Sequence, residues 1–272
     1  MKNIKHLLLA LLCYSSASFA QLKAVRYSDG TQVLNGFSVQ PKATRQQKPG
    51  ILILPAWMGI DALSKDTAEN LSKLGYYAFV ADIYGEGNYP KDYAEAGQKA
   101  GFYKKNYIEY QKRISLALKQ LILAGANPDN IVVIGYCFGG TGALESARGH
   151  LNLRGVVSFH GGLGRDATRI LEPITTPVLV CHGADDPYES KEEVEGFQQE
   201  MKSTKADWQM IYYANAVHSF TNPEAGTDNS KGAAYNEKAA KRSWEHLKIF
   251  LNEVLTVQFY RKQLNPHLEK SR

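Results

Sequence analysis

The segment Ile131-Val132-Val133-Ile134-Gly135-Tyr136-Cys137-Phe138-Gly139-Gly140 carries the strongest structural signal in the chain. Its apolar start is typical of a strand covered on both faces, and a helical pattern follows the glycines. Glycines on both sides of Cys137 suit a sharp turn that strains its central residue. A helix start beside the thiol favours the thiolate. We therefore predict that Cys137 is a nucleophile presented at a strand-to-helix turn; a buried structural cysteine is the alternative.

Strand and helix patterns alternate on both sides of this segment. The expected strands are 50–54, 77–81, 131–135, 155–159, 178–181 and 209–213, and the expected helices are about 62–74, 91–124, 139–148, 191–201 and 232–255. Asp61 is a suitable N-cap for the first helix and Gly75 a suitable stop. Alternation of this kind implies crossover connections and a mainly parallel sheet.

An earlier pair of alternating runs, 24–28 and 32–40, flanks Asp29-Gly30. Asp-Gly between such runs indicates a β-hairpin, so we expect an antiparallel edge at the N-terminal side of the sheet. No internal repeat or linker divides the chain. The predicted fold class is α/β, with about eight strands in a mainly parallel sheet and helices on both faces.

Composition excludes several classes of protein. The chain has 272 residues, of which 44% are hydrophobic and 22% charged, as in an ordinary globular protein. Its net charge of +5 comes from dispersed basic residues, so we expect no nucleic-acid partner. No phosphate-binding Gly-x-Gly-x-x-Gly follows an early strand, and His182 with Asp185 and Asp186 lacks further spaced ligands. We expect neither a cofactor nor a metal ion.

The first twenty residues resemble a cleaved secretory signal. Lys2 and Lys5 precede a short apolar run, and small residues occupy the −3 and −1 positions before a cleavage site after Ala20. A lipidated Cys13 is the alternative, although Leu12 stands where such signals need a small residue. We expect an exported, periplasmic or secreted protein without stable membrane insertion, whose domain covers 21–256 and whose basic tail, 257–272, is loosely attached.

Two further motifs follow later strands. In Val178-Leu-Val-Cys181-His182-Gly183-Ala184-Asp185-Asp186-Pro187, a strand ends in a turn with two acids. Asp186 is our choice over Asp185 for an acid that orients a histidine, and His182 is expected to be structural. In Ala216-Val217-His218-Ser219-Phe220-Thr221-Asn222-Pro223, His218 lies in the loop beyond the next strand. The order nucleophile, acid, base at successive strand ends matches the α/β-hydrolase arrangement.

With these motifs the sequence resembles the dienelactone hydrolase family of α/β-hydrolases over roughly residues 33–255. The matching pieces are Gly135-Tyr136-Cys137-Phe138-Gly139-Gly140, Ala81-Asp82-Ile83-Tyr84-Gly85, His182-Gly183-Ala184-Asp185-Asp186 and Val217-His218-Ser219-Phe220-Thr221-Asn222-Pro223. The resemblance implies a triad of Cys137, His218 and Asp186, with an oxyanion hole from the backbone N–H groups of Phe138 and Trp57. It also implies a small-molecule ester, lactone or thioester substrate. We expect a monomer or homodimer.

Two positions depart from the family pattern. Ala56 stands where members acting on dienelactones carry an activating glutamate, and Glu86 stands where they carry an arginine that binds the substrate carboxylate. Activation of the thiol would then depend on His218 and the helix terminus, and Glu86 would favour a neutral or cationic ester. A non-catalytic binding protein with the same fold is the alternative function, and a thiol redox protein is a third.

Weaker candidates for the substrate pocket are Tyr84, Glu86 and His160. The aromatic residues between 93 and 110 suit either a cap over the site or packing on the sheet. A disulfide between Cys137 and Cys181 is not expected, because a middle strand would hold the two strands roughly 10 Å apart, beyond the ~7 Å limit for a bridge.

Overall fold

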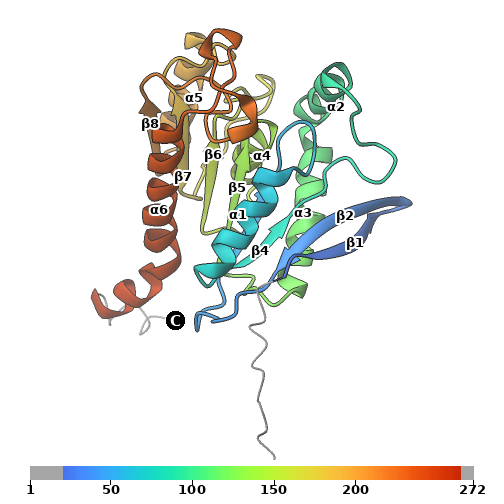
Figure 1. Cartoon of the computed structure of the whole chain (residues 1–272). Coiled ribbons are helices and arrows are strands. Elements are labelled where there is room, and N and C mark those ends of the chain that lie inside the picture. Colours follow the sequence, from blue (N-terminus) through green and yellow to red (C-terminus); the bar gives the residue numbers. More distant parts are fainter. Residues whose placement is uncertain (1–20, 265–272) are drawn as a thin grey trace, which may run out of the picture.

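The computed structural model describes residues 21–264 and contains one eight-stranded sheet (Figure 1). Its strands are β1 (Lys23–Asp29), β2 (Gln32–Val39), β3 (Gly50–Leu54), β4 (Tyr77–Val80), β5 (Ile131–Tyr136), β6 (Gly155–Phe159), β7 (Val178–Gly183) and β8 (Trp208–Tyr213). Their order is β1-β2-β4-β3-β5-β6-β7-β8. The β1–β2 and β2–β4 pairs are antiparallel and all others parallel. The predicted α/β fold with an antiparallel edge is confirmed.

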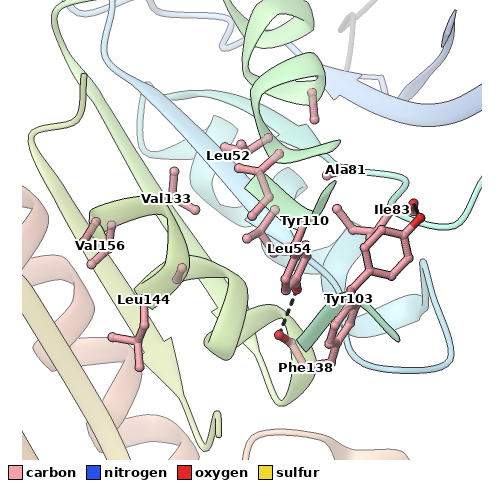
Figure 2. Close-up of a cluster of buried hydrophobic side chains, with 14 of the residues drawn as sticks. Leu52, Leu54, Ala81, Ile83, Tyr103, Tyr110, Val133, Phe138, Leu144 and Val156 are labelled. Atoms are coloured by element: carbon pink, nitrogen blue, oxygen red, sulfur yellow. Dashed lines mark hydrogen bonds between the residues drawn. The ribbon is translucent and has the colours of Figure 1, made fainter. Parts of the chain in front are cut away.

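Helices cover both faces of the sheet. They are α1 (Ala62–Lys73), α2 (Tyr93–Lys105), α3 (Tyr107–Leu123), α4 (Phe138–Arg148), α5 (Lys191–Ser203) and α6 (Glu237–Leu264). One core contains buried residues of α2 to α5, among them Tyr110 and Phe197, and the other contains buried residues of α1 and α6, such as Leu71 and Leu251. Successive strand side chains point to opposite faces, so each central strand supplies both cores and consists mostly of apolar residues. Figure 2 shows part of the first core.

Two of the expected helices have different bounds in the structure. The expected helix over 91–124 is divided at Asn106, which has φ −108° and ψ 62° and lies between α2 and α3. Its side-chain amide donates to the Phe102 carbonyl at 2.8 Å, a local bond that competes with helix continuation. The last helix begins at Glu237 rather than at 232, because Gly232 has φ +79° and ends a short 3₁₀ turn (Asn229–Lys231).

The C-terminal part of α6 runs past the expected helix end at 255 and reaches Leu264. The predicted signal segment, 1–20, and the last eight residues of the predicted tail, 265–272, lie outside the described residues. Within the described part of the chain, no helix is long and apolar enough to cross a membrane.

The parallel strands place the candidate residues at one edge of the sheet. Cys137 follows β5, Asp186 follows β7 and His218 follows β8. Because β5 and β7 are both neighbours of β6 and all three are parallel, their carboxyl ends meet at the same edge. The sheet order also places β6 between the strands of Cys137 and Cys181, as expected, and both cysteines are free.

Candidate active site

Cys137 occupies a strained turn between β5 and α4. Its φ of +54° and ψ of −116° lie outside the regions that L-residues normally adopt. The surrounding backbone holds this conformation: the Cys137 N–H donates to the Phe159 carbonyl at 3.0 Å, and the Cys137 carbonyl accepts from the Gly140 N–H at 2.9 Å. The turn therefore matches a nucleophile elbow in its conformation as well as in its sequence.

The glycines around Cys137 allow three segments to meet at the elbow. A β-carbon at Gly135 would collide with the backbone of Gly139, and one at Gly139 would collide with the carbonyl groups of Leu54 and Pro55. The first turn of α4 is thus packed directly against the end of β3. This contact brings the loop after β3, which contains Trp57, beside the nucleophile.

Aromatic residues join that loop to the elbow. Residues 56–59 form a turn closed by a hydrogen bond from the Gly59 N–H to the Ala56 carbonyl at 3.0 Å. The Trp57 N–H takes no part in that bond. The Tyr84 hydroxyl donates to the Trp57 carbonyl at 2.7 Å, and the Tyr84 ring stacks on Phe138 with centroids 5.8 Å apart. Tyr84 is buried and its hydroxyl is engaged with this loop. It therefore links the two segments that carry the predicted oxyanion donors.

Phe138 is held on its other side by α3. Its ring stacks on Tyr110 with centroids 4.6 Å apart, and the Tyr110 hydroxyl donates to the Phe138 carbonyl at 2.9 Å (Figure 2). The tyrosine-rich helices thus pack their aromatic residues on the elbow, although Tyr93 and Phe102 remain exposed on α2.

Asp186 and His218 contact each other as the predicted triad requires. Asp186 Oδ2 lies 2.9 Å from His218 Nδ1, and the Asp186 side chain is fully buried. The other carboxylate oxygen of Asp186 accepts the Tyr188 N–H at 3.0 Å. The neighbouring Asp185 is exposed and lies outside this arrangement. Backbone bonds to Gly232 and Ala234 hold the loop that carries His218.

Cys137 and His218 stabilise each other's charged form. Burial raises the pKa of the Cys137 thiol, but the hydrogen bond and charge of His218, the charge of Lys104 and the Phe138 N–H together lower it below its usual value. Burial also disfavours a charged His218, yet its hydrogen bonds to Asp186 and Cys137 raise its pKa to about 10. The interaction therefore shifts both groups toward their charged forms, the Cys137 thiolate and the His218 imidazolium.

His160 lies behind His218 in the interior. Its Nε2 lies 2.7 Å from the Thr221 hydroxyl, and its ring meets the His218 ring edge-on with centroids 5.2 Å apart. Burial and the charge of His218 hold the pKa of His160 well below its usual range. His182 is also buried, and burial lowers its pKa. Both rings are neutral supports around the imidazolium of His218.

Glu86 contacts the N-terminal hairpin. Its carboxylate lies 3.5 Å from Arg26 Nη2 and accepts a hydrogen bond from the Asn35 side-chain amide at 3.5 Å. Its backbone bonds to Val33 and Gln32 of β2. Among residues 21–264, no hydrogen bond or ion pair joins Glu86 to Cys137 or His218. The structure thus brings Cys137, Asp186, His218, Trp57, Phe138, Tyr84 and His160 together and directs Glu86 elsewhere.

A cavity of about 530 Å³ adjoins the site. Its walls include Lys104, Thr141, Gly162, Tyr188 and Glu189. The Tyr188 ring also meets the His218 ring edge-on with centroids 5.3 Å apart, so one wall residue of the cavity contacts His218. None of these wall residues was predicted from the sequence. Only Thr141 had a local signal, because it lies one helical turn after Cys137.

The site contains histidine, cysteine and aspartate side chains, which are residue types that can bind metal ions. Within the described residues, no group of three or more His, Cys, Asp and Glu side chains is arranged to hold a metal ion.

Comparisons with known proteins agree on the family. The dienelactone hydrolase family model matches residues 34–255. The crystal structure of a dienelactone hydrolase-like promiscuous phosphotriesterase from metagenomic libraries is 33% identical, with a TM-score of 0.80, and the match covers 86% of this chain and 98% of that one.

Two sequence relatives point the same way. A Bradyrhizobium protein named "Probable 2-oxo-3-(5-oxofuran-2-ylidene)propanoate lactonase" is 28% identical over 75% of this chain and 83% of its own length. The carboxymethylenebutenolidase of Rhodococcus opacus is 22% identical over 76% of this chain and 82% of its own. The chain therefore belongs to the dienelactone hydrolase family, whose members hydrolyse ester and lactone bonds.

Proposed function

We propose that this protein hydrolyses a carboxylic ester, lactone or thioester through an acyl-enzyme on Cys137. The observation that carries the proposal is the strained strand-to-helix turn of Cys137 together with His218, whose Nδ1 lies 2.9 Å from the fully buried Asp186 carboxylate. Relatives named as a lactonase and a carboxymethylenebutenolidase support a lactone or ester substrate. Cys137 supplies the nucleophile and His218 the proton donor, and each shifts the pKa of the other toward the charged form that the reaction needs.

The first step is attack of the Cys137 thiolate on the substrate carbonyl carbon. A carbon–sulfur bond forms as the carbonyl π electrons move to oxygen. The N–H groups of Phe138 and Trp57 donate to this oxyanion, since both segments are held at the elbow by Tyr84. Two such donors contribute a few kcal/mol to stabilisation of the transition state.

His218 then completes the acylation half-reaction. Collapse of the intermediate breaks the carbon–oxygen bond to the leaving alcohol, and the imidazolium donates its Nε2 proton to that oxygen. The products are a neutral His218, a free alcohol and a thioester on Cys137. Acylation removes the thiolate whose hydrogen bond and charge raise the pKa of His218, so the proton is released when it is needed.

Deacylation reverses these roles. Neutral His218 takes a proton from water as the water oxygen bonds to the thioester carbon. The carbon–sulfur bond breaks, the acid leaves, and Cys137 returns as a thiolate beside a protonated His218. Asp186 stabilises the imidazolium at both stages and keeps Nδ1 directed away from the substrate.

Hydrolysis of p-nitrophenyl acetate and butyrate by residues 21–272 tests the proposal. We expect turnover by the native chain and by Cys181→Ala, and loss of turnover in Cys137→Ala. Cys181 is the matched control because its thiol is buried in β7 and burial raises its pKa to about 12. Equal rates in the native chain and Cys137→Ala would contradict the assignment. A native chain that binds these esters without turnover would favour a non-catalytic binding protein.

We further propose that the protein is exported and that cleavage after Ala20 produces a chain beginning at Gln21. The basic, apolar and small-residue pattern of residues 1–20 supports this. Expression of the full chain followed by N-terminal sequencing of the exported fraction tests it. A product beginning at Cys13 would identify the lipidated alternative.

A further inference from the structure

Three polar atoms from distant segments converge on the space in front of Gly162. A β-carbon at Gly162 would lie 2.9 Å from Thr141 Oγ1, 3.0 Å from Lys104 Nζ and 3.5 Å from Glu189 Oε1. Thr141 belongs to α4, Lys104 to α2, and Glu189 to the loop before α5. Because Gly162 has no side chain, this space remains part of the 530 Å³ cavity.

Each of these atoms has unused capacity for hydrogen bonding. Thr141 is only 4% exposed, and its hydroxyl has no partner within the described residues. No ion pair or hydrogen bond within residues 21–264 engages the Lys104 ammonium. Glu189 uses one carboxylate oxygen to accept the Leu163 N–H at 3.0 Å, and the atom nearest Gly162 is the other oxygen. A buried hydroxyl without a partner indicates a place for a water or ligand.

The chemistry of the three groups favours a neutral hydroxyl. Lys104 donates, Thr141 donates or accepts, and the Glu189 carboxyl offers an acceptor oxygen. A hydroxyl can satisfy all of these at once, because it both donates and accepts. A carboxylate at this place would face the Glu189 side chain, and a cation would face Lys104.

The position of the cavity assigns it to the alcohol part of the substrate. Tyr188 lines the cavity and packs edge-on against His218, which must protonate the leaving oxygen. The leaving alcohol therefore lies on the His218 side of the reacting carbonyl, and Tyr188 is the residue that contacts both His218 and the cavity. Thr141 lies in the first turn of the helix that follows Cys137, and its N–H donates to the Cys137 carbonyl at 3.2 Å.

We propose that the space over Gly162 binds a hydroxyl group on the alcohol portion of the substrate, so that the enzyme prefers esters of polyhydroxy alcohols. This rests on the proposed esterase function and adds its substrate class. Thr141, Lys104 and Glu189 are the groups that recognise the hydroxyl, and Gly162 leaves room for it.

The test compares glyceryl monobutyrate with propyl butyrate, which share an acyl group and differ by two hydroxyls. We expect the native enzyme to have a kcat/KM for the glyceryl ester about tenfold higher or more, in line with the free energy of a net hydrogen bond. Thr141→Val and Lys104→Met should each reduce this ratio severalfold, mainly through KM. Lys119→Met, which removes an exposed lysine on α3, should leave the ratio unchanged.

Gly162→Ala provides a further test in case replacement of the buried Thr141 impairs folding. Gly162→Ala places a methyl group where the three polar atoms converge and should also reduce the ratio. The inference is overturned if the native enzyme hydrolyses both esters with equal kcat/KM, or if neither Thr141→Val nor Lys104→Met changes the ratio. Absence of turnover with these and the p-nitrophenyl esters would instead overturn the esterase function.

Discussion

Cys137 and His218 depend on each other for their charges, and Asp186 supports the imidazolium from behind. The thiolate predominates above the lowered pKa of Cys137, and the imidazolium persists up to the pKa of His218 at about 10. Between these two values both charges exist together. The acylation step uses both, so its rate should be level within this window and should fall above about pH 10, where His218 loses the proton required by the leaving group.

Asp186→Asn tests the support given to the pair. Loss of the carboxylate lowers the pKa of His218, and the weaker imidazolium in turn raises the pKa of the Cys137 thiol. The rise of iodoacetamide alkylation with pH should therefore move to higher pH, and the alkylation rate at pH 7 should fall by about tenfold or more. Asp185→Asn is the matched control, because Asp185 is exposed. An unchanged alkylation profile in Asp186→Asn would contradict this account.

The elbow is also a contact between elements, in which the first turn of α4 meets the end of β3. Gly139 permits this approach, since a β-carbon there would strike the carbonyl groups of Leu54 and Pro55. The same contact sets the distance between the loop of Trp57 and the N–H of Phe138. Helix packing thus determines both stability and the spacing of the oxyanion donors.

Gly139→Ala should therefore harm stability and catalysis together. We expect a loss of about 1–3 kcal/mol in the free energy of unfolding, from overpacking against backbone, and a lower kcat for p-nitrophenyl butyrate. Urea denaturation and steady-state kinetics measure the two effects. Gly196→Ala in α5 is the control: its added methyl group meets no atom within 4 Å, so it should stabilise the protein by up to about 1 kcal/mol. A neutral Gly139→Ala would refute the packing argument.

Further from the site, a buried ion network joins α4 to α5 and to the loop after β6. Arg148 donates to Glu200 through Nε and Nη2, at 2.9 and 2.7 Å, and to Glu145 at 3.0 Å. Arg169 donates to Glu145 at 2.6 Å. Arg165 Nε also lies 3.9 Å from Glu200, so three arginines surround the two buried carboxylates. The network therefore holds the helix that starts at the nucleophile against the rest of the domain.

Removal of one partner should leave a buried charge uncompensated. Arg148→Met is expected to destabilise the fold by about 3–5 kcal/mol, because Glu200 and Glu145 lose their main partner. Adding Glu200→Met should recover part of that loss. Glu195→Gln, in the exposed pair with Lys191, should change stability by less than about 0.5 kcal/mol. Urea unfolding of the native protein, Arg148→Met, the Arg148→Met/Glu200→Met double variant and Glu195→Gln measures these changes. Equal losses in the free energy of unfolding for Arg148→Met and Glu195→Gln would exclude a stabilising role for the network.

Much of the fold and part of the site could be predicted because their signals are local in the chain. Apolar runs such as 131–135 mark central strands, and the glycines beside Cys137 mark the elbow. Asp186 and His218 follow successive strands whose parallel ends must meet, so their position at one edge followed from topology. The break at Asn106 was not foreseen, because it depends on one side-chain bond to Phe102 and no glycine or proline marks it.

Other features depend on packing between segments far apart in the chain. Lys104, Thr141 and Glu189 meet over Gly162 only because α2, α4 and the loop before α5 pack around the same cavity. Glu86 bonds to the N-terminal hairpin, although Tyr84, two residues earlier, contacts Trp57 and Phe138 at the site. Sequence patterns predict periodicity, turns and strand ends, because these features depend on residues that are close together in the chain. The direction of a side chain at a loop or helix surface depends on which distant element fills the adjacent space, and that is established when the chain folds.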